Sequence, residues 1–284
     1  MNEEINERDL RFSFGSNWDK FSNKIDEERI KSSENSLKLL LKENNLRNKR
    51  FLDLGCGSGL SSLVALNLGA EVVAFDFDEK SVETTKKIIA KYQPSKVDTT
   101  PVYQGSVLDE QYMNSLGIFD IVYAWGVLHH TGDMWQAIRI ASEAVAPGGR
   151  FALAIYNDQG GSSVRWRAIK KAYIKGSRLR KSFLVGLIGF FFEVRAFLVR
   201  VIKFQNPMPI SDWTERKANR GMSVFHDLID WVGGYPFEVA KPEELLEFLV
   251  ERGFVLHHLK TCGGGHGCNE YLFIRSSNLK RCQD

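Results

Sequence analysis

Three glycines follow one another closely in the stretch RFLDLGCGSGLSSLVA, residues 50–65. Gly55, Gly57 and Gly59 have no Cβ, so the backbone there can turn sharply and approach a ligand. The apolar run before them is typical of a β-strand, and the apolar spacing after them predicts a helix whose first N–H groups point at the ligand. The stretch therefore predicts a strand, a glycine turn and a helix that hold a nucleotide-like cofactor.

The spacing of the glycines separates two kinds of cofactor. The dinucleotide fingerprint requires G-x-G-x-x-G, whereas here the third glycine comes one residue early and Leu60 takes its usual place. This spacing disfavours NAD. For the turn alone, a tight strand-to-helix connection that binds nothing remains the alternative.

Two aspartates add chemistry to the turn. Asp76 ends a predicted strand about twenty residues after it, where a carboxylate can accept hydrogen bonds from both hydroxyls of a ribose. The alternative role for Asp76 is the N-cap of the next helix, but Asp78 is better placed for that. Asp53 lies inside an apolar strand, where burial is costly unless the carboxylate meets donors or a cation. An amino group on the ligand would satisfy it.

Strands that alternate with helices must position these residues. We expect strands at 51–54, 71–78, 100–105, 119–126, 150–158, 254–261 and 270–275. Such alternation predicts a parallel α/β sheet with helices on both faces and ligands at the carboxyl ends of the strands. The last run follows Lys260 too closely for a helical crossover, so we expect it to pair antiparallel with its predecessor.

The chain is expected to divide into three parts. Residues 1–47 form an N-terminal helical lid or flank, 48–157 with 241–276 form the sheet domain, and 158–240 form a mostly helical insertion after the fifth strand. The insertion is interpreted as a substrate lid or as a contact with a membrane or a second copy. An ordinary satellite core is the alternative for its aromatic-rich downstream part.

The insertion contains a basic run followed by an apolar run. Residues 165–181 hold eight Lys or Arg and no acid, and 183–204 are almost wholly apolar. Glu193, Arg195 and Arg200 interrupt the apolar run too often for a typical transmembrane span. A basic cluster beside an apolar face suits an anionic membrane or a lipidic substrate, and burial against the sheet domain or in a homodimer is the alternative.

Composition limits the classes of function. With 43% hydrophobic residues in 284, the chain is long enough for one large α/β domain with an insertion. The formal net charge of +3 is small, which disfavours a nucleic-acid partner. The charged N-terminus, MNEEINERDL, is followed by no apolar stretch, so we expect a cytoplasmic protein with reduced thiols, peripheral to a membrane if 183–204 contacts one.

Five segments taken together resemble a known family. The order LDLGCGSG, AFD, GSVLD, FDIVYAWGVLHHTGD and APGGRFALAIY is similar to the class I S-adenosylmethionine-dependent methyltransferases, and closest to the small-molecule branch with the ubiquinone-biosynthesis O-methyltransferases. The resemblance covers 48–157 and 241–276. It implies a Rossmann-like sheet of seven strands, mostly parallel with an antiparallel last strand. It further implies methyl transfer from S-adenosylmethionine to a small-molecule or lipid-like acceptor, most simply a hydroxyl.

The resemblance also implies roles for cofactor-binding residues. Gly55 and Gly57 would approach the methionine portion, Asp53 its ammonium and Asp76 the ribose. The remaining candidates for cofactor contact are Ser106, Val107, Trp125 and Trp18. The family often has Asp where this chain has Ser106, so Asp109 is the alternative partner for the adenine amino group.

Histidines are the candidates for the base that deprotonates an acceptor. His130 follows the fourth strand and matches the family's histidine, and its neighbour His129 would point about 100° away on a helix start. One of the two is expected to face the site and the other to pack. His266, in the loop TCGGGHGCN, is a third candidate. Its spacing from Cys262 and Cys268 matches no common zinc pattern, so we predict no metal.

The acceptor is expected to contact residues at the ends of the later strands. The candidates are Tyr156, Asn157, Asp227 and Asn269. Four other functions remain as alternatives: a nicotinamide dehydrogenase, an RNA methyltransferase, a protein methyltransferase and a non-catalytic module that binds the cofactor. The segment AWGV after the fourth strand differs from the Asn-Pro-Pro-Tyr-like segment of enzymes that methylate base amines, which disfavours RNA.

Overall fold

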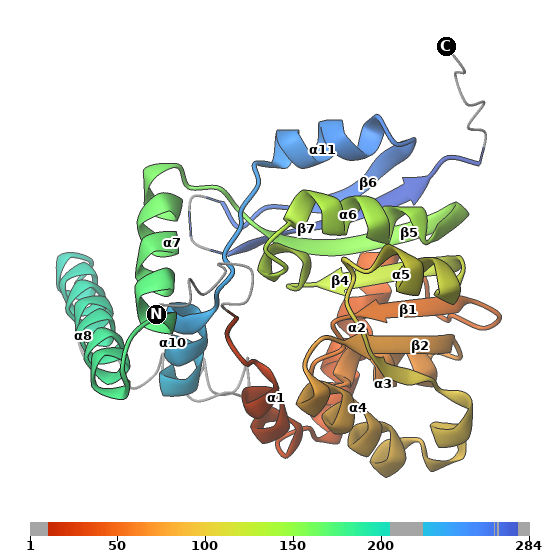
Figure 1. Cartoon of the computed structure of the whole chain (residues 1–284), viewed down its shortest axis with the longest axis horizontal. Helices are drawn as coiled ribbons and strands as arrows, with labels where there is room; N and C mark the ends of the chain where they lie inside the picture. The colour runs from red at the N-terminus through yellow and green to blue at the C-terminus, as the bar shows by residue number, and fades with distance from the viewer. Residues whose placement is uncertain (1–10, 205–223, 264, 266, 278–284) are drawn as a thin grey trace, which may run out of the picture. The chain divides into compact units, whose positions relative to one another are not determined.

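A computed structural model describes residues 11–204, 224–263, 265 and 267–277 of the chain (Figure 1). The chain divides into two compact units. One comprises Ser13–Gly160 with Glu238–Asp284, and the other comprises Met1–Phe12 with Gly161–Phe237. We call them the sheet unit and the helical unit and describe each by itself.

The sheet unit contains seven strands in the order β3-β2-β1-β4-β5-β7-β6. Their bounds are β1 Arg50–Leu54, β2 Glu71–Asp76, β3 Val102–Gln104, β4 Phe119–Trp125, β5 Val145–Tyr156, β6 Phe254–Lys260 and β7 Cys268–Arg275. Strands β1 to β5 pair in parallel, and β7 lies between β5 and β6 and is antiparallel to both. The predicted fold class, including the antiparallel last strand, is confirmed.

Helices cover both faces of the sheet because alternate strand residues point to opposite faces. On one face Leu52 and Leu54 pack with α5 (Glu110–Leu116), α6 (Met134–Glu143) and α11 (Pro242–Val250). On the other face Phe51 packs with α2 (Glu27–Leu41), α3 (Leu60–Asn67) and α4 (Glu79–Tyr92). The short helices η2 (Pro94–Thr99) and η3 (Leu128–His130) lie in the connections before β3 and after β4.

The N-terminal helix α1 (Gly15–Ser22) belongs to the sheet unit and packs against α4. Asp78 explains this attachment. Its carboxylate caps α4 by accepting from the Lys80 N–H, and it also accepts from the Ser13 hydroxyl and the Gly15 N–H, at 2.9, 3.0 and 3.1 Å. The prediction that Asp78 caps this helix is confirmed, and the same side chain fixes the start of α1.

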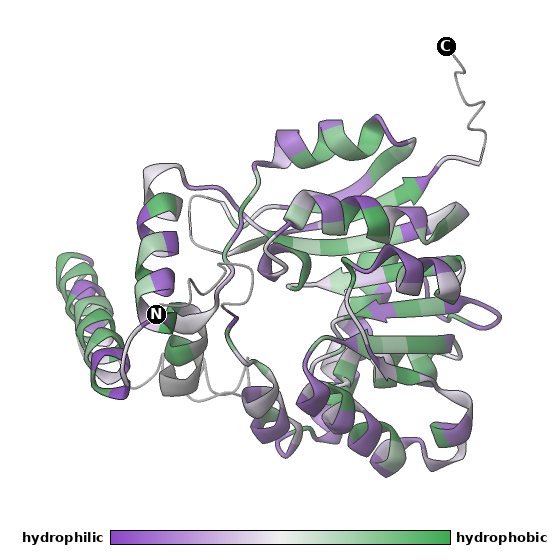
Figure 2. Ribbon diagram, viewed as in Figure 1, coloured by the Kyte–Doolittle hydropathy of each residue, from purple (hydrophilic) through white to green (hydrophobic). Residues whose placement is uncertain are grey.

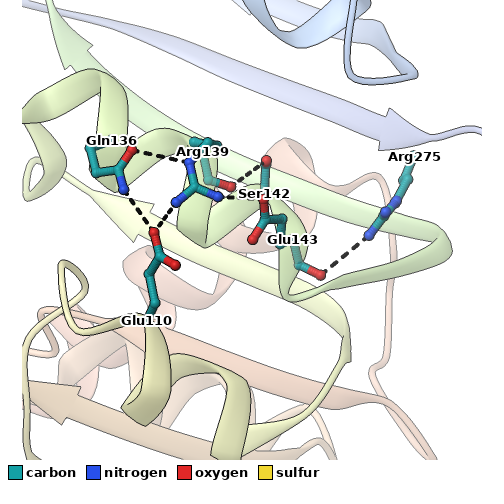
Figure 3. Close-up of polar contacts among 6 residues, drawn as sticks. All are labelled: Glu110, Gln136, Arg139, Ser142, Glu143 and Arg275. Atoms are coloured by element: carbon teal, nitrogen blue, oxygen red, sulfur yellow. Dashed lines mark hydrogen bonds and ion pairs between the residues drawn. The ribbon is translucent and has the colours of Figure 1, made fainter.

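A polar network closes the edge of the sheet where the parallel strands begin (Figure 3). Arg139 of α6 pairs with Glu110 of α5 and with Glu143 of its own helix. Arg275, at the end of β7, donates to the carbonyls of Glu143 and Val145 at 3.3 and 2.6 Å. These interactions fix α6, so the residues that precede it are held at the opposite edge.

The helical unit contains α7 (Gly161–Ile174), α8 (Arg178–Ile202) and α10 (Val224–Gly233). Its core gathers Tyr173, Val185 and Val232, one from each helix. Lys170 of α7 is buried and donates to the Trp231 carbonyl, and its ammonium lies 4.6 Å from the Trp231 ring centroid. The lysine therefore joins α7 to α10.

Candidate functional site

The glycine turn after β1 has the backbone that its sequence predicts. Gly55, Gly57 and Gly59 have φ angles of 69°, 54° and 77°, in the left-handed region that side chains disfavour. A Cβ at Gly55 would lie 2.5 Å from a methyl carbon of Val127. The N–H groups of Gly55 and Cys56 both donate to the Phe75 carbonyl, at 2.8 and 3.0 Å. The turn is therefore anchored to the end of β2.

Asp76 lies beside this turn at the end of β2. One of its carboxylate oxygens accepts from the Gly57 N–H at 3.0 Å and the other from the Asp78 N–H at 2.9 Å. Burial raises the pKa of Asp76 to about 6, although these two hydrogen bonds oppose the shift. A carboxylate has about four lone-pair positions, and the backbone of Phe77 also donates to this one, so Asp76 keeps capacity for a further donor such as a hydroxyl.

Asp53 is buried in the middle of the sheet. One of its oxygens accepts from the Ser62 hydroxyl of α3 at 2.6 Å. Burial raises the pKa of Asp53 to about 7, and the nearby charge of Asp76 contributes in the same direction. The Ser62 hydroxyl thus supplies one of the donors that this buried carboxylate requires. The second oxygen of Asp53 could meet an ammonium group.

The loop after β3 contains the predicted adenine contacts. Val107 is buried in the core, whereas Ser106 is half-buried and its hydroxyl accepts from the Leu108 N–H at 3.2 Å. Asp109, the alternative candidate, caps α5 by accepting from the Tyr112 N–H at 3.0 Å. Both polar side chains therefore already shape the loop, and the adenine assignment remains a prediction.

The two candidate tryptophans lie near the turn and at the end of β4. A Cβ at Gly57 would lie 3.2 Å from the Trp18 indole, so this ring from α1 packs directly on the glycine turn. Trp125 stacks on Tyr123, with ring centroids 5.4 Å apart and planes 5° apart. The sequence placed both near the cofactor, and the structure brings Trp18 within contact of Gly57.

Four aromatic rings gather near the carboxyl ends of β4 and β5. His129 lies 4.0 Å from Tyr156 and 4.4 Å from His130 between ring centroids, and His130 lies 5.0 Å from Phe14. His129 is buried, whereas His130 is half-buried. Of the two histidines, His129 is therefore the one that packs.

Glu238 holds this cluster in place, a role that the sequence analysis missed. Its carboxylate accepts from the N–H groups of Gly132 and Met134 at 3.0 and 3.1 Å, and its own N–H donates to the His129 carbonyl at 3.0 Å. The carboxylate thus caps α6 and fixes η3 from a distant part of the chain. In the sequence, Glu238 was only an acidic residue in an aromatic-rich segment, and nothing there indicated that it contacts the start of α6.

The structure brings together two of the predicted acceptor contacts. The buried Asn269 side chain donates to the Asn157 side chain at 3.0 Å and accepts from the Cys262 N–H at 3.0 Å. Asn269 therefore links Cys262, which follows β6, to Asn157, which follows β5. Asn157, which is half-buried, and Tyr156 lie at the end of β5 beside it.

Two predicted site residues cannot be placed. His266 lies outside the described residues, and Asp227 lies in α10 with a side chain that is not described. Among the residues that the structure does describe, no group of three or more His, Cys, Asp or Glu could hold a metal ion.

Comparison with protein families identifies the central segment. Residues 52–151 match the family described as "Methyltransferase domain". This range extends from β1 into β5 and so contains the glycine turn, Asp76 and the two histidines. The resemblance predicted from the sequence is confirmed for this part of the chain.

Curated relatives match the same part of the chain. It is 33% identical over 108 residues to a ubiquinone biosynthesis O-methyltransferase of Caulobacter sp. (strain K31), which covers 38% of this chain and 41% of that protein. It is 34% identical over 106 residues to the 27-O-demethylrifamycin SV methyltransferase of Amycolatopsis mediterranei, covering 37% of each chain. The chain thus spans about two fifths of the length of these relatives.

A solved structure shows the same fold. The magnesium protoporphyrin IX methyltransferase of Synechocystis PCC 6803, with bound SAH, aligns with a TM-score of 0.52 and 16% identity. The alignment covers 87% of this chain and 84% of that one. At 16% identity, this likeness supports a shared fold and nothing further.

Proposed function

We propose that this protein, whose residues 52–151 form a methyltransferase domain, transfers a methyl group from S-adenosylmethionine to a small-molecule or lipid-like acceptor, most simply to a hydroxyl. The observation that carries the proposal is the hydrogen bond between Asp76 and the Gly57 N–H. It combines a left-handed glycine turn with a carboxylate that retains acceptor capacity, at the edge of the sheet where ligands of parallel α/β folds bind.

The residues at this edge fit the proposed cofactor. Asp76 would accept from the ribose hydroxyls, and the second oxygen of Asp53 would face the ammonium group. The glycine turn would lie along the methionine portion, because only glycines allow the backbone to come so close. When bound, S-adenosylmethionine would supply an electrophilic methyl group. The protein must then align the acceptor and remove its proton.

We propose His130 as the base that removes this proton. It follows β4 at the ligand-binding edge and is less buried than His129. Its ring lies 5.5 Å from Tyr156 and 5.0 Å from Phe14 between centroids, in a near-perpendicular and a tilted arrangement. These neighbours restrict the orientation of the His130 ring. A general base needs such a fixed orientation to meet the hydroxyl of its acceptor. Tyr156 and Asn157 would border the acceptor.

Relatives named for different methyl acceptors favour this class without selecting one acceptor. The named relatives act in ubiquinone and rifamycin chemistry, and both are named as methyltransferases. Transfer to RNA or to protein, and cofactor binding without catalysis, are the rival functions. A dehydrogenase is disfavoured by the glycine spacing.

The test uses the full chain and two measurements. Calorimetry should detect binding of S-adenosylhomocysteine and not of NADH. Incubation with methyl-labelled S-adenosylmethionine and fractionated lysate should then move label into a small-molecule or lipid fraction. Label found in RNA or protein would redirect the proposal to a rival acceptor, and cofactor binding without any labelled product would support the non-catalytic alternative.

A further inference from the structure

Helix α8 of the helical unit consists mostly of apolar residues (Figure 2), and many of its large apolar side chains are exposed. Phe190 and Phe191 are 69% and 61% exposed. Other large apolar side chains of the helix that are exposed are Leu179, Phe183, Leu187, Val194, Phe197, Leu198, Val199, Val201 and Ile202. Most of these residues fall within an arc of about 140° at 100° per residue. The outward face of α8, as we call this arc, is a large apolar surface that the described residues leave exposed.

The inward side of the same helix is the more polar one. Gly189 approaches Leu228 of α10 so closely that a Cβ would lie 2.8 Å from it. Glu193 and Ala196 are half-buried and Arg200 is buried. The sequence places the small or polar residues Gly189, Glu193, Ala196 and Arg200 at spacings of four, three and four, which forms one stripe on a helix. This stripe therefore faces the protein. This reverses the amphipathicity expected of a surface helix in water.

The basic run lies directly before this outward face. Lys175, Arg178 and Arg180 are exposed, and the first turn of α8 contains no acid. Cations at a helix N-terminus oppose the helix dipole, so these arginines destabilise the helix that they begin. A ligand with negative charge would offset that effect.

We propose that the outward face of α8 docks on an anionic lipid bilayer, with the exposed Lys175, Arg178 and Arg180 at the headgroups. The observation behind this proposal is the combination of an exposed apolar arc with the adjacent exposed cations Lys175, Arg178 and Arg180. An anionic bilayer is complementary to both, because acyl chains accept the aromatic side chains and headgroups attract the arginines. Arg195 is exposed at the border of the arc, where a long side chain can reach the headgroups.

The geometry favours a helix in the plane of the interface over one that crosses the membrane. By length and composition alone α8 is able to cross a bilayer. However, α7 packs along it through Tyr173 and carries the exposed Arg165 and Arg167. Hydrocarbon on all sides would enclose these arginines, which is costly. Coiled-coil pairing of α8 with a second copy of the chain is disfavoured because the arc is broader than the narrow seam of such pairs.

The test is flotation of the full chain with two kinds of vesicle. One is phosphatidylcholine alone, and the other contains phosphatidylglycerol as well. The wild-type protein should bind the anionic vesicles, and added salt should weaken the binding. The double variant Phe190→Ser with Phe191→Ser should lower the binding about tenfold or more, because it removes two aromatic side chains whose transfer from water to lipid favours binding. Its melting temperature should stay unchanged, since both side chains are exposed.

A matched control makes the same chemical change elsewhere. Leu39 and Ile118 are exposed on the sheet unit, so Leu39→Ser with Ile118→Ser should leave vesicle binding unchanged. A charge variant, Arg178→Glu with Arg180→Glu, should lose the preference for anionic vesicles. It should also fold well, because Ser177 caps α8 and Glu at residue 180 completes a capping box.

Three outcomes would overturn the proposal. The first is a wild-type protein that binds neither kind of vesicle. The second is equal loss of binding in the control variant. The third is a dimer in sedimentation velocity that the Phe190→Ser, Phe191→Ser variant converts to a monomer, because a second copy would then cover the face. None of these measurements depends on methyl transfer, so the proposed function can fail or stand separately.

Discussion

The carboxylate of Asp76 accepts the N–H of Gly57 at 3.0 Å, so the end of β2 holds the glycine turn that follows β1. Its other oxygen accepts a hydrogen bond from the Asp78 N–H at 2.9 Å, at the start of the next helix. One side chain therefore fixes two neighbouring loops at the ligand-binding edge. Any hydroxyl that meets the remaining lone pairs meets an acceptor that is already oriented.

Asp76→Asn should weaken binding of S-adenosylhomocysteine by about 1.4–3 kcal/mol, because charge-assisted hydrogen bonds to the ribose are lost. Calorimetry measures the affinity. Asp120→Asn is the control, since Asp120 also accepts a backbone N–H, that of Arg50, but at the opposite edge of the sheet. Equal affinity in the Asp76 variant and the wild-type protein would contradict the ribose assignment.

The contribution of Asp53 to the free energy of unfolding should decrease as the pH rises. Its pKa is 3.8 in the unfolded reference and about 7 when folded, so the native state binds its proton more tightly. The free energy of unfolding then decreases with rising pH between these two values. Asp53→Asn keeps an acceptor for Ser62 and cannot ionise. It should flatten the pH profile of the melting temperature and raise stability above neutral pH, whereas an unchanged profile would assign the dependence to other groups.

Cofactor affinity should show the opposite pH dependence. An ammonium group beside Asp53 favours the carboxylate, so binding of S-adenosylhomocysteine should tighten as the pH rises from about 5 to about 7. Calorimetry at several pH values measures this. The trend should disappear in Asp53→Asn if Asp53 faces the ammonium group. A trend that persists in this variant would point to Asp76, whose pKa is raised to about 6.

The two adjacent histidines should separate in function. His130→Ala should lower kcat by roughly 10²–10⁴ while S-adenosylhomocysteine binds almost normally, as expected for loss of a general base. His129→Ala should mainly lower the melting temperature, because His129 is buried against Tyr156. Steady-state kinetics and melting curves on both variants check this. A reversed result would exchange the roles of the two residues.

Local signals in the sequence were sufficient for the strands and for the caps formed by nearby residues. Asp78 illustrates this, because a cap requires only the residues that immediately follow it. The pairing of β7 was not predicted in full. The short connection indicated an antiparallel pair with β6, but the insertion of β7 between β5 and β6 depends on strands far apart in the chain.

Long-range contacts explain the other omissions. Glu238 caps α6 across 106 residues from Gly132, and no spacing rule links the two. In α8 the periodicity revealed a stripe of small and polar residues but not which side of the helix faces the protein. The contact of Gly189 with Leu228 decides that, and it depends on how α8 packs against α10.

Asn269 and Asn157 should prove to have different roles although they are hydrogen-bonded to each other. Asn269→Ala leaves the Cys262 N–H without its acceptor in a part-buried loop, so it should lower the free energy of unfolding by about 1–3 kcal/mol. Asn157 is half-buried, and Asn157→Ala should cost less stability. If Asn157 borders the acceptor, its loss should raise the KM for the acceptor while S-adenosylhomocysteine affinity stays the same. Chemical denaturation and kinetics on the two variants separate these effects. A KM change in Asn269→Ala alone, at normal stability, would instead show that Asn269 contacts the acceptor and that the loop does not need it.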